Sequence, residues 1–583
     1  MGTISELREL EALLHDIDRK GYGAYKRIAG AWAGTGFTLF IDHVQQDPFA
    51  SPSRVRVRLP QETHQIPMDL WRLPPRKVAV EDFLMRAFAR AVRERPRGGG
   101  SGRSGEVRVD AGGAEILART GCELQKDWLE LRFRVGLPAA DRSILGGDAA
   151  ELLCRCLPQA VQAVYWEHLD QGSVHEWANL VEDHAGLQEE LSRRKLVAFV
   201  RDGSILPRLS GVSQRPLTDA VPFATPPSLH VTFPTLHHGE VTGMGIPAGV
   251  TLITGGGFHG KTTLLEALQR AVYPHVPGDG REWVVCRFGA VKVRSEDGRA
   301  VTGVDLRPFI NELPGGKDTR SFSTQDASGS TSLAATILES IEVGADTILL
   351  DEDTCSSNLL VQDALMQKLI PKETITPLVD RAREFSLTLG VSVVLVVGGS
   401  GDYLEIADTV ILMEDYLPRD VTLEAHRIAR DNPTGRIRTH PEQPLRVAPR
   451  APLPRSFDLR GGRRERVKAR GQRELVYGEN VIDLSALEQL VDDSQARAIG
   501  ELLRRLRTLT RSDLPLRELL RNLYDEVDMH GLHSLAASPE LAMPRPFEVA
   551  GVINRLRSLV VEPISVFPEG TAKSVGLQAA VTS

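Results

Sequence analysis

The sequence predicts an α/β fold: a mostly parallel sheet, an α+β domain before it and a small helical domain after it. Three observations carry this prediction. Residues 236–425 alternate short β-branched segments with helix-periodic ones, which is typical of parallel sheets. Within that region a glycine-rich loop stands between an expected strand and an expected helix. Residues 474–583 show helical periodicity, for example over 484–506.

Composition excludes several classes of protein. The 583 residues are 42% hydrophobic and 25% charged, with a net charge of −7, which is ordinary for a globular chain and excludes a disordered or collagen-like one. No apolar run reaches the ~18 residues that span a bilayer, and the first residues lack the basic and apolar regions of a signal peptide. Five scattered cysteines form neither a disulfide framework nor a zinc-binding spacing. We therefore expect a soluble, cytoplasmic protein without a membrane partner.

The expected domains are 1–235, 236–425, a basic flexible segment at 426–473 and 474–583. The first mixes helices and strands. Its expected helices are 4–17, 83–95 and 180–195, and its expected strands are 37–44, 54–59, 106–109 and 128–135.

A glycine-rich loop in the second domain predicts phosphate binding. Residues 255–262 read GGGFHGKT and fit G-x-x-x-x-G-K-[ST] at every fixed position. Glycines let backbone N–H groups surround a phosphate, and the following helix directs its positive end at the same anion. The lysine would reach the β- and γ-phosphates of ATP, and the threonine hydroxyl would bind Mg²⁺. The expected nucleotide-binding residues are Gly255, Gly256, Gly257, Phe258, His259, Gly260, Lys261, Thr262 and Thr263.

A second motif lies 90 residues further on. Residues 347–352 form a hydrophobic strand that ends in two acids, Asp351 and Glu352. Ligands bind at the carboxyl ends of strands in parallel sheets. We expect Asp351 to hold Mg²⁺ with Thr262, and Glu352 to orient and deprotonate an attacking water.

A small polar turn at 326–331 opens an expected helix 23 residues before Asp351, counted from Ser328. Alone, such a turn is usually only a helix cap. Its position matches the signature loop of ABC-type ATPases, and residues 353–358, DTCSSN, resemble the D-loop of that family. The order of motifs therefore resembles an ABC-type nucleotide-binding domain.

Longer stretches resemble a narrower family, the predicted ABC-class ATPases with an extra N-terminal domain. The similarity spans about residues 20–425 and most of the tail. Its main stretches are 22–30, 40–58, 135–146, 196–211, 243–265, 276–282, 326–335 and 396–416.

This resemblance implies a mechanism and partners. Members are soluble and lack transporter spans. In ABC-type domains Ser328, Gly329 and Ser330 of one copy would close the ATP site formed by Lys261 and Glu352 of another, so two composite sites require a homodimer. One relative is associated with mitochondrial RNA processing and resembles a ring-shaped dimer that binds RNA.

Two departures from transporter-type ABC domains stand out. The short spacing of the two motifs leaves little room for the helical subdomain that couples to membrane partners. The switch histidine is missing, because residues 398–402 read GGSGD. Ser400 or Asp402 would then take its place, or hydrolysis would be slow.

Three further residues have open roles. His259 is either a space-filling loop residue or a catalytic one. Phe233 and His237 are weak candidates for stacking on adenine.

The leading functional hypothesis is an ATP-driven clamp on nucleic acid, with RNA favoured over DNA. Residues 426–473 carry 14 Lys and Arg against 4 Asp and Glu. Two further groups of arginines add basic sites, one on a single face of an expected strand. They are Arg54, Arg56 and Arg58, and Arg93, Arg95, Arg97 and Arg103.

Other hypotheses remain. A basic run is often only a solvated linker, and an aromatic content of 5% argues against dense base stacking. The alternatives are a regulatory or protein-remodelling ATPase without nucleic acid, and a phosphotransferase whose N-terminal domain holds an acceptor.

Overall fold

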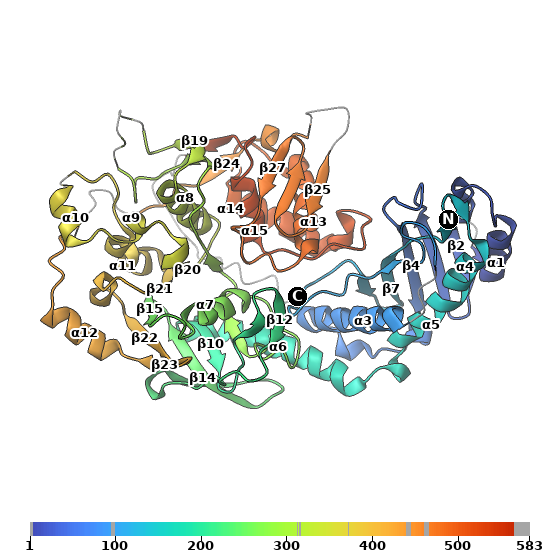
Figure 1. The fold of residues 1–583 in the computed structure, drawn as a ribbon, viewed down its shortest axis with the longest axis horizontal. Helices are drawn as coiled ribbons and strands as arrows, with labels where there is room; N and C mark the ends of the chain where they lie inside the picture. Colours follow the sequence, from blue (N-terminus) through green and yellow to red (C-terminus); the bar gives the residue numbers. More distant parts are fainter. Residues whose placement is uncertain are drawn as a thin grey trace. The chain divides into compact units, whose positions relative to one another are not determined.

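A computed structural model describes residues 4–94, 99–311, 313, 316, 318–370, 372–438, 445–459 and 466–564. The chain divides into two compact units (Figure 1). The first unit comprises the residues up to Glu182 together with His530–Met543, and the second comprises Asp183–Met529 and the described residues from Pro544 onward. The boundary therefore differs from the expected one at residue 235. Strands β10 (Leu196–Arg201) and β13 (His230–Pro234) pair with β14 (Glu240–Pro247), which places all three in the second unit.

The first unit is built on a seven-stranded sheet. Its order is β1-β2-β3-β4-β7-β5, with β6 also paired to β7. The strands are β1 (Ser5–Glu6), β2 (Gly30–Gly34), β3 (Phe37–His43), β4 (Ser53–Pro60), β5 (Val107–Arg108), β6 (Cys122–Leu124) and β7 (Trp128–Val135), with a hairpin of β8 (Ala139–Ala140) and β9 (Ser143–Ile144). The helices are α1 (Leu7–Asp16), α2 (Gln61–His64), α3 (Pro74–Glu94), α4 (Gly146–Ala150), α5 (Leu157–Val161) and α6 (Gln171–Arg193), whose last turns belong to the second unit.

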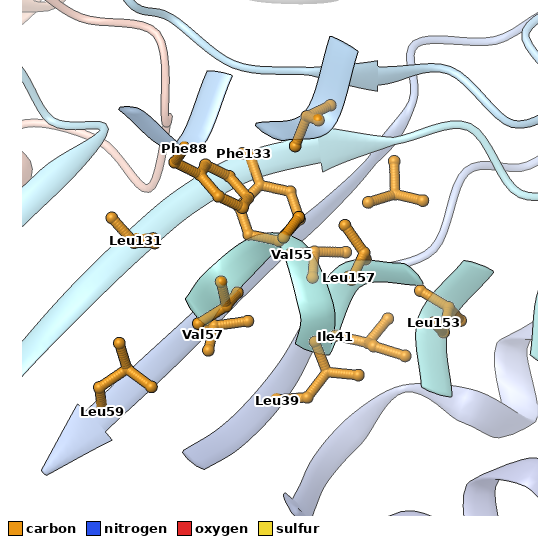
Figure 2. Packing of buried hydrophobic residues seen from close by; sticks show 14 of the residues in the cluster. Leu39, Ile41, Val55, Val57, Leu59, Phe88, Leu131, Phe133, Leu153 and Leu157 are labelled. Carbon is orange, nitrogen blue, oxygen red and sulfur yellow. The ribbon is translucent and has the colours of Figure 1, made fainter. Parts of the chain in front are cut away.

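One face of this sheet is apolar and forms the core of the unit. Alternation along β4 buries Val55, Val57 and Leu59 on this face and leaves its arginines on the other. The buried side chains of β3, β4 and β7 pack with those of α3 and α5 (Figure 2). Phe88 of α3 and Phe133 of β7 meet with ring centroids 5.0 Å apart.

The second unit contains the parallel sheet that the sequence predicts. Its order is β17-β20-β21-β15-β22-β23, and only β23 runs antiparallel to its neighbour. The register pairs Ile253 of β15 with Val396 of β21, and Val396 with Asp351 of β20. The carboxyl ends of these three strands, each followed by a predicted motif, therefore lie at one edge of the sheet.

The remaining elements of this unit complete the fold. The strands are β11 (Arg208–Ser210), β12 (Ser213–Pro216), β15 (Val250–Gly255), β16 (Val284–Cys286), β17 (Ala290–Lys292), β18 (Arg299–Val304), β19 (Phe322–Ala327), β20 (Thr347–Asp351), β21 (Ser392–Val396), β22 (Thr409–Glu414), β23 (Leu417–Asp420), β24 (Arg450–Pro452), β25 (Val467–Arg470), β26 (Glu474–Tyr477), β27 (Asn480–Asp483) and β28 (Val561–Pro563). The helices are α7 (Lys261–Arg270), α8 (Gly329–Glu342), α9 (Ser357–Leu360), α10 (Ala364–Leu369), α11 (Leu378–Leu389), α12 (Thr422–Asp431), α13 (Asp493–Leu509), α14 (Leu516–His530) and α15 (Pro546–Asn554).

The C-terminal region is mainly helical, as the sequence predicts. The expected helix at 484–506 begins later, at Asp493, where Asp492 caps α13 and its carboxylate accepts the N–H of Ser494. A three-stranded sheet of β25, β26 and β27 precedes this helix. The sequence analysis did not predict this sheet. Among the helices that the structure describes, none has the length and apolarity required to cross a membrane.

Two arginines of the basic segment are buried in ion pairs. The side chains of Arg436 and Arg450 are 6% and 3% exposed. Arg436 pairs with Asp380, and Nη2 of Arg450 lies 2.6 Å from a carboxylate oxygen of Glu342. These two residues join the segment to the second unit and are not surface cations.

We expect Arg450→Met to lower the free energy of unfolding by about 3–5 kcal/mol, because it leaves Glu342 buried without its cation. Burial already raises the pKa of Glu342, although Arg450 opposes the shift. The loss should therefore be large at neutral pH and shrink in acid, where the carboxyl is protonated in both states. Urea unfolding at two pH values measures it. Exposed Arg446→Met is the matched control, and equal stability of the two variants would contradict the prediction.

Candidate active site

The glycine-rich loop joins β15 to α7 at the carboxyl edge of the six-stranded sheet. Gly255 has φ 140°, and a Cβ built there would lie 2.3 Å from the carbonyl oxygen of Met413. Gly260 caps α7 with φ 93°. Both positions therefore require glycine. Phe258 lies between them with φ 65° and is 97% exposed, so an aromatic residue occupies a strained position on the surface of the loop.

The residues of this loop fit a phosphate group. Nζ of Lys261 donates to the carbonyl oxygens of Gly255 and Gly256, each at 2.7 Å. The backbone N–H groups of residues 257–260 donate hydrogen bonds to no described residue. N–H groups without an acceptor, an ammonium group and the N-terminus of a helix are the groups that anion sites use in proteins.

Asp351 ends β20 at the same edge of the sheet and is 4% exposed. One of its carboxylate oxygens accepts the N–H of Asp353 at 3.1 Å, and burial raises the pKa of Asp351 above its ordinary value. The charge of Lys292 opposes this shift, and a divalent cation would oppose it further. Of the neighbouring candidates on α7, Thr262 is exposed and Thr263 is half-buried. Among the described residues, no group of three or more His, Cys, Asp or Glu is placed to hold a metal ion.

Glu352, the predicted base, is held by backbone groups. Its Oε2 accepts the N–H of Gly398 at 2.7 Å and that of Gly399 at 3.1 Å. These glycines follow β21, in the segment where the switch histidine is missing. The Ser400 hydroxyl instead donates to Asp402 at 3.0 Å. The sequence did not predict the contact between Glu352 and the two glycine N–H groups, because every residue type except proline carries a backbone N–H.

The expected signature turn begins helix α8. Ser328 is the N-cap, and its hydroxyl accepts an N–H from the first turn at 3.4 Å. The Ser330 hydroxyl donates to Oδ1 of Asn358 at 2.7 Å. A Cβ on Gly329 would lie 2.5 Å from Oγ of Ser356, so a larger residue would require the Ser356 side chain to move. The signature turn and the predicted D-loop of the same chain are therefore packed together.

The structure gives evidence on the roles of His259 and Phe233, which the sequence left open. His259 accepts the N–H of Asp415 at 2.8 Å, which ties the phosphate loop to the turn between β22 and β23 and favours a structural role. Phe233 is fully buried in an edge-to-face contact with Phe199, with centroids 5.2 Å apart, so no face is free for adenine. His237 remains exposed.

Three family models match the chain in succession. Residues 7–167 match the N-terminal domain of ATPases of the ABC class, 170–450 match the P-loop domain of ABC ATPases, and 466–562 match the MRB1590 C-terminal domain. An uncharacterized protein of Methanocaldococcus jannaschii, MJ1628, is 30% identical over 251 residues, which are 41% of this chain and 55% of that protein. The chain thus spans about half the length of this curated relative.

Two solved structures have a low overall similarity to the chain. One is cbiO1 from Clostridium perfringens, part of the ABC transporter complex cbiONQ, with 14% identity, a TM-score of 0.25 and coverage of 41% of this chain and 95% of that one. The other is the ADP conformation of MJ1267, an ATP-binding cassette of an ABC transporter, with 10% identity, a TM-score of 0.25 and coverage of 41% and 96%. From the three successive family matches and the order of its motifs, the chain belongs to the ABC-class ATPases that carry an additional N-terminal domain.

Proposed function

We propose that this chain hydrolyses ATP at two composite sites of a homodimer and uses the cycle to close on RNA. The supporting observation is the register of β15, β21 and β20, in which the phosphate loop and the two acids follow strands that end at one sheet edge. The chain has one such loop and one signature turn, so a closed pair of copies has two equivalent sites.

The residues have distinct roles in this proposal. Lys261 and the N–H groups of the loop hold and orient the β- and γ-phosphates. Thr262 and Asp351 hold Mg²⁺, which when bound neutralises charge on the transferred phosphoryl group. Glu352 orients the attacking water and takes its proton. The turn at 328–330 of the second copy closes over the phosphates with its hydroxyls and the N-terminus of α8.

Support for RNA comes from charge and from resemblance. The described arginines of β4 and β7 share one face of the first unit. Residues 466–562 match the MRB1590 C-terminal domain. The sequence also resembles a family with a ring-shaped, RNA-binding member. Phosphate contacts by clustered arginines do not require a basic chain overall.

A regulatory or protein-remodelling ATPase without nucleic acid is the second candidate. The observation that favours it is the burial of Arg436 and Arg450, which removes two cations from the basic segment.

The rate of ATP hydrolysis with and without RNA separates the two candidates. We expect RNA to raise the rate of the purified full chain severalfold at low salt, and the increase to fade at higher salt because phosphate contacts release counterions. DNA of equal length is the comparison. A measurable rate that is indifferent to RNA and DNA at both salt concentrations would favour the second candidate. No hydrolysis under any condition would contradict the enzymatic part of the proposal.

A further inference from the structure

The first unit contains a cavity of about 480 Å³ on the face of its sheet opposite the apolar core. Strands β4 and β7 form its floor, and residues 536–539, which return from the C-terminal region, form one wall. Four arginines line it, namely Arg54, Arg56, Arg58 and Arg132. The cavity shares no lining residue with the proposed ATP site.

The strand register brings like charges together. Arg54 of β4 lies opposite Arg134 of β7, and Arg56 lies opposite Arg132. Like charges directly opposite each other destabilise a sheet, and any β-forming residue would satisfy the fold here. Carboxylates offset this repulsion for Arg56, Arg132 and Arg134, which are in ion pairs, but not for Arg54.

The carboxylates at the cavity do not balance these cations. Three line it, Asp42, Glu123 and Glu130, against four arginines, which leaves an excess of one positive charge. Glu130 is shared, since its oxygens lie within 2.8 Å of Arg56, Arg58 and Arg132. Burial alone would raise the pKa of Glu123, but Arg132 holds it below its ordinary value, so this carboxylate is ionised and bound.

Arg54 is the arginine at the cavity that lacks a carboxylate partner among the described residues. Its Nη1 donates to the carbonyl oxygen of Ala537 at 2.8 Å, and no carboxylate among the described residues pairs with it. A guanidinium has five N–H donors in a fixed fork, so Arg54 and its neighbours have donors to spare. Trp128 and His533 also line the cavity, and the Arg58 guanidinium lies 4.3 Å from the Trp128 ring.

We propose that this cavity binds the phosphate of a nucleotide-sized ligand, with Arg54 and Arg58 as its main contacts. The volume lies in the range of small-molecule sites, and a planar fork matches phosphate oxygens in pairs. Trp128 provides an aromatic surface at the same cavity for the rest of the nucleotide. The phosphate comes either from a free nucleotide or from RNA, and only the RNA source rests on the proposed function.

Binding to the full chain tests the inference. The probes are AMP and a 12-nucleotide RNA without ATP, in a Lys261→Ala background that silences the phosphate loop. We expect Arg54→Gln with Arg58→Gln to weaken binding about tenfold or more, because each loses charged hydrogen bonds. Arg155→Gln, on an arginine of the same unit that is 63% exposed, is the matched control.

Each outcome decides the inference. Weaker binding of RNA or AMP by the double variant, but not by the control, supports the cavity and identifies the source. If the parent chain binds AMP but no RNA, and the double variant loses AMP binding, the result supports the phosphate site in the cavity and contradicts the RNA clamp. Unchanged binding of both probes, or no binding of either by the parent, overturns the inference. If the double variant does not fold, slower labelling of Arg54 by phenylglyoxal in the presence of either probe supports the site, and unchanged labelling rejects it.

Discussion

Two inactive variants, Lys261→Ala and Ser330→Arg, are expected to recover ATP hydrolysis when they are mixed. Each variant alone has the same defect in both composite sites. In a mixed pair, one site carries both defects and the other carries none. Free exchange makes half of the pairs mixed, with one intact site in two, so we expect about a quarter of the wild-type rate. Phosphate release after incubation of the two chains with ATP measures it.

The control for this recovery is a pair of defects in the same half of the site. Lys261→Ala mixed with Glu352→Gln should recover nothing, because both residues belong to the half that carries the phosphate loop and the acids. Equal recovery in the two mixtures would contradict the composite arrangement. No recovery in either, from variants that fold and from an active wild type, would indicate sites built within one chain.

Glu352→Gln is expected to reduce hydrolysis about 100-fold or more while ATP binding persists, since it removes the general base but keeps the phosphate loop. Glutamine retains an oxygen that can accept the N–H groups of Gly398 and Gly399, so the loop after β21 should stay in place. With ATP held but not hydrolysed, the two copies should remain closed. The checks are the turnover rate and the molar mass from light scattering, with and without ATP.

Glu405→Gln, which changes an exposed carboxylate of the same unit, is the control and should leave turnover and mass unchanged. A monomer of the Glu352 variant under saturating ATP would contradict the homodimer. Wild-type turnover in that variant would remove Glu352 from the proposed chemistry and shift attention to Asp402 and the segment around it.

The local part of the site could be predicted from the sequence. Gly255 and Gly260 adopt left-handed backbone conformations beside Lys261, and only a pattern of glycines at that spacing permits such a loop between a strand and a helix. The strand that ends in Asp351 was also predictable, because a hydrophobic run followed by acids indicates the carboxyl edge of a parallel sheet. These signals lie within a few residues of each other along the chain.

Contacts between distant segments required the tertiary structure. The N–H groups that hold Glu352 lie 46 and 47 residues away, and Arg54 reaches a carbonyl 483 residues away at Ala537. The assignment of residues 530–543 to the first unit also depends on contacts between segments that are distant in the sequence. The sequence by itself determined the family, the glycine-rich loop, and the strand that ends in Asp351 and Glu352. Each of these depends on residue types at a fixed local spacing. Only the tertiary structure decided which backbone groups hold Glu352, which arginines are buried and which line a cavity, since packing between distant elements sets these and leaves no local pattern.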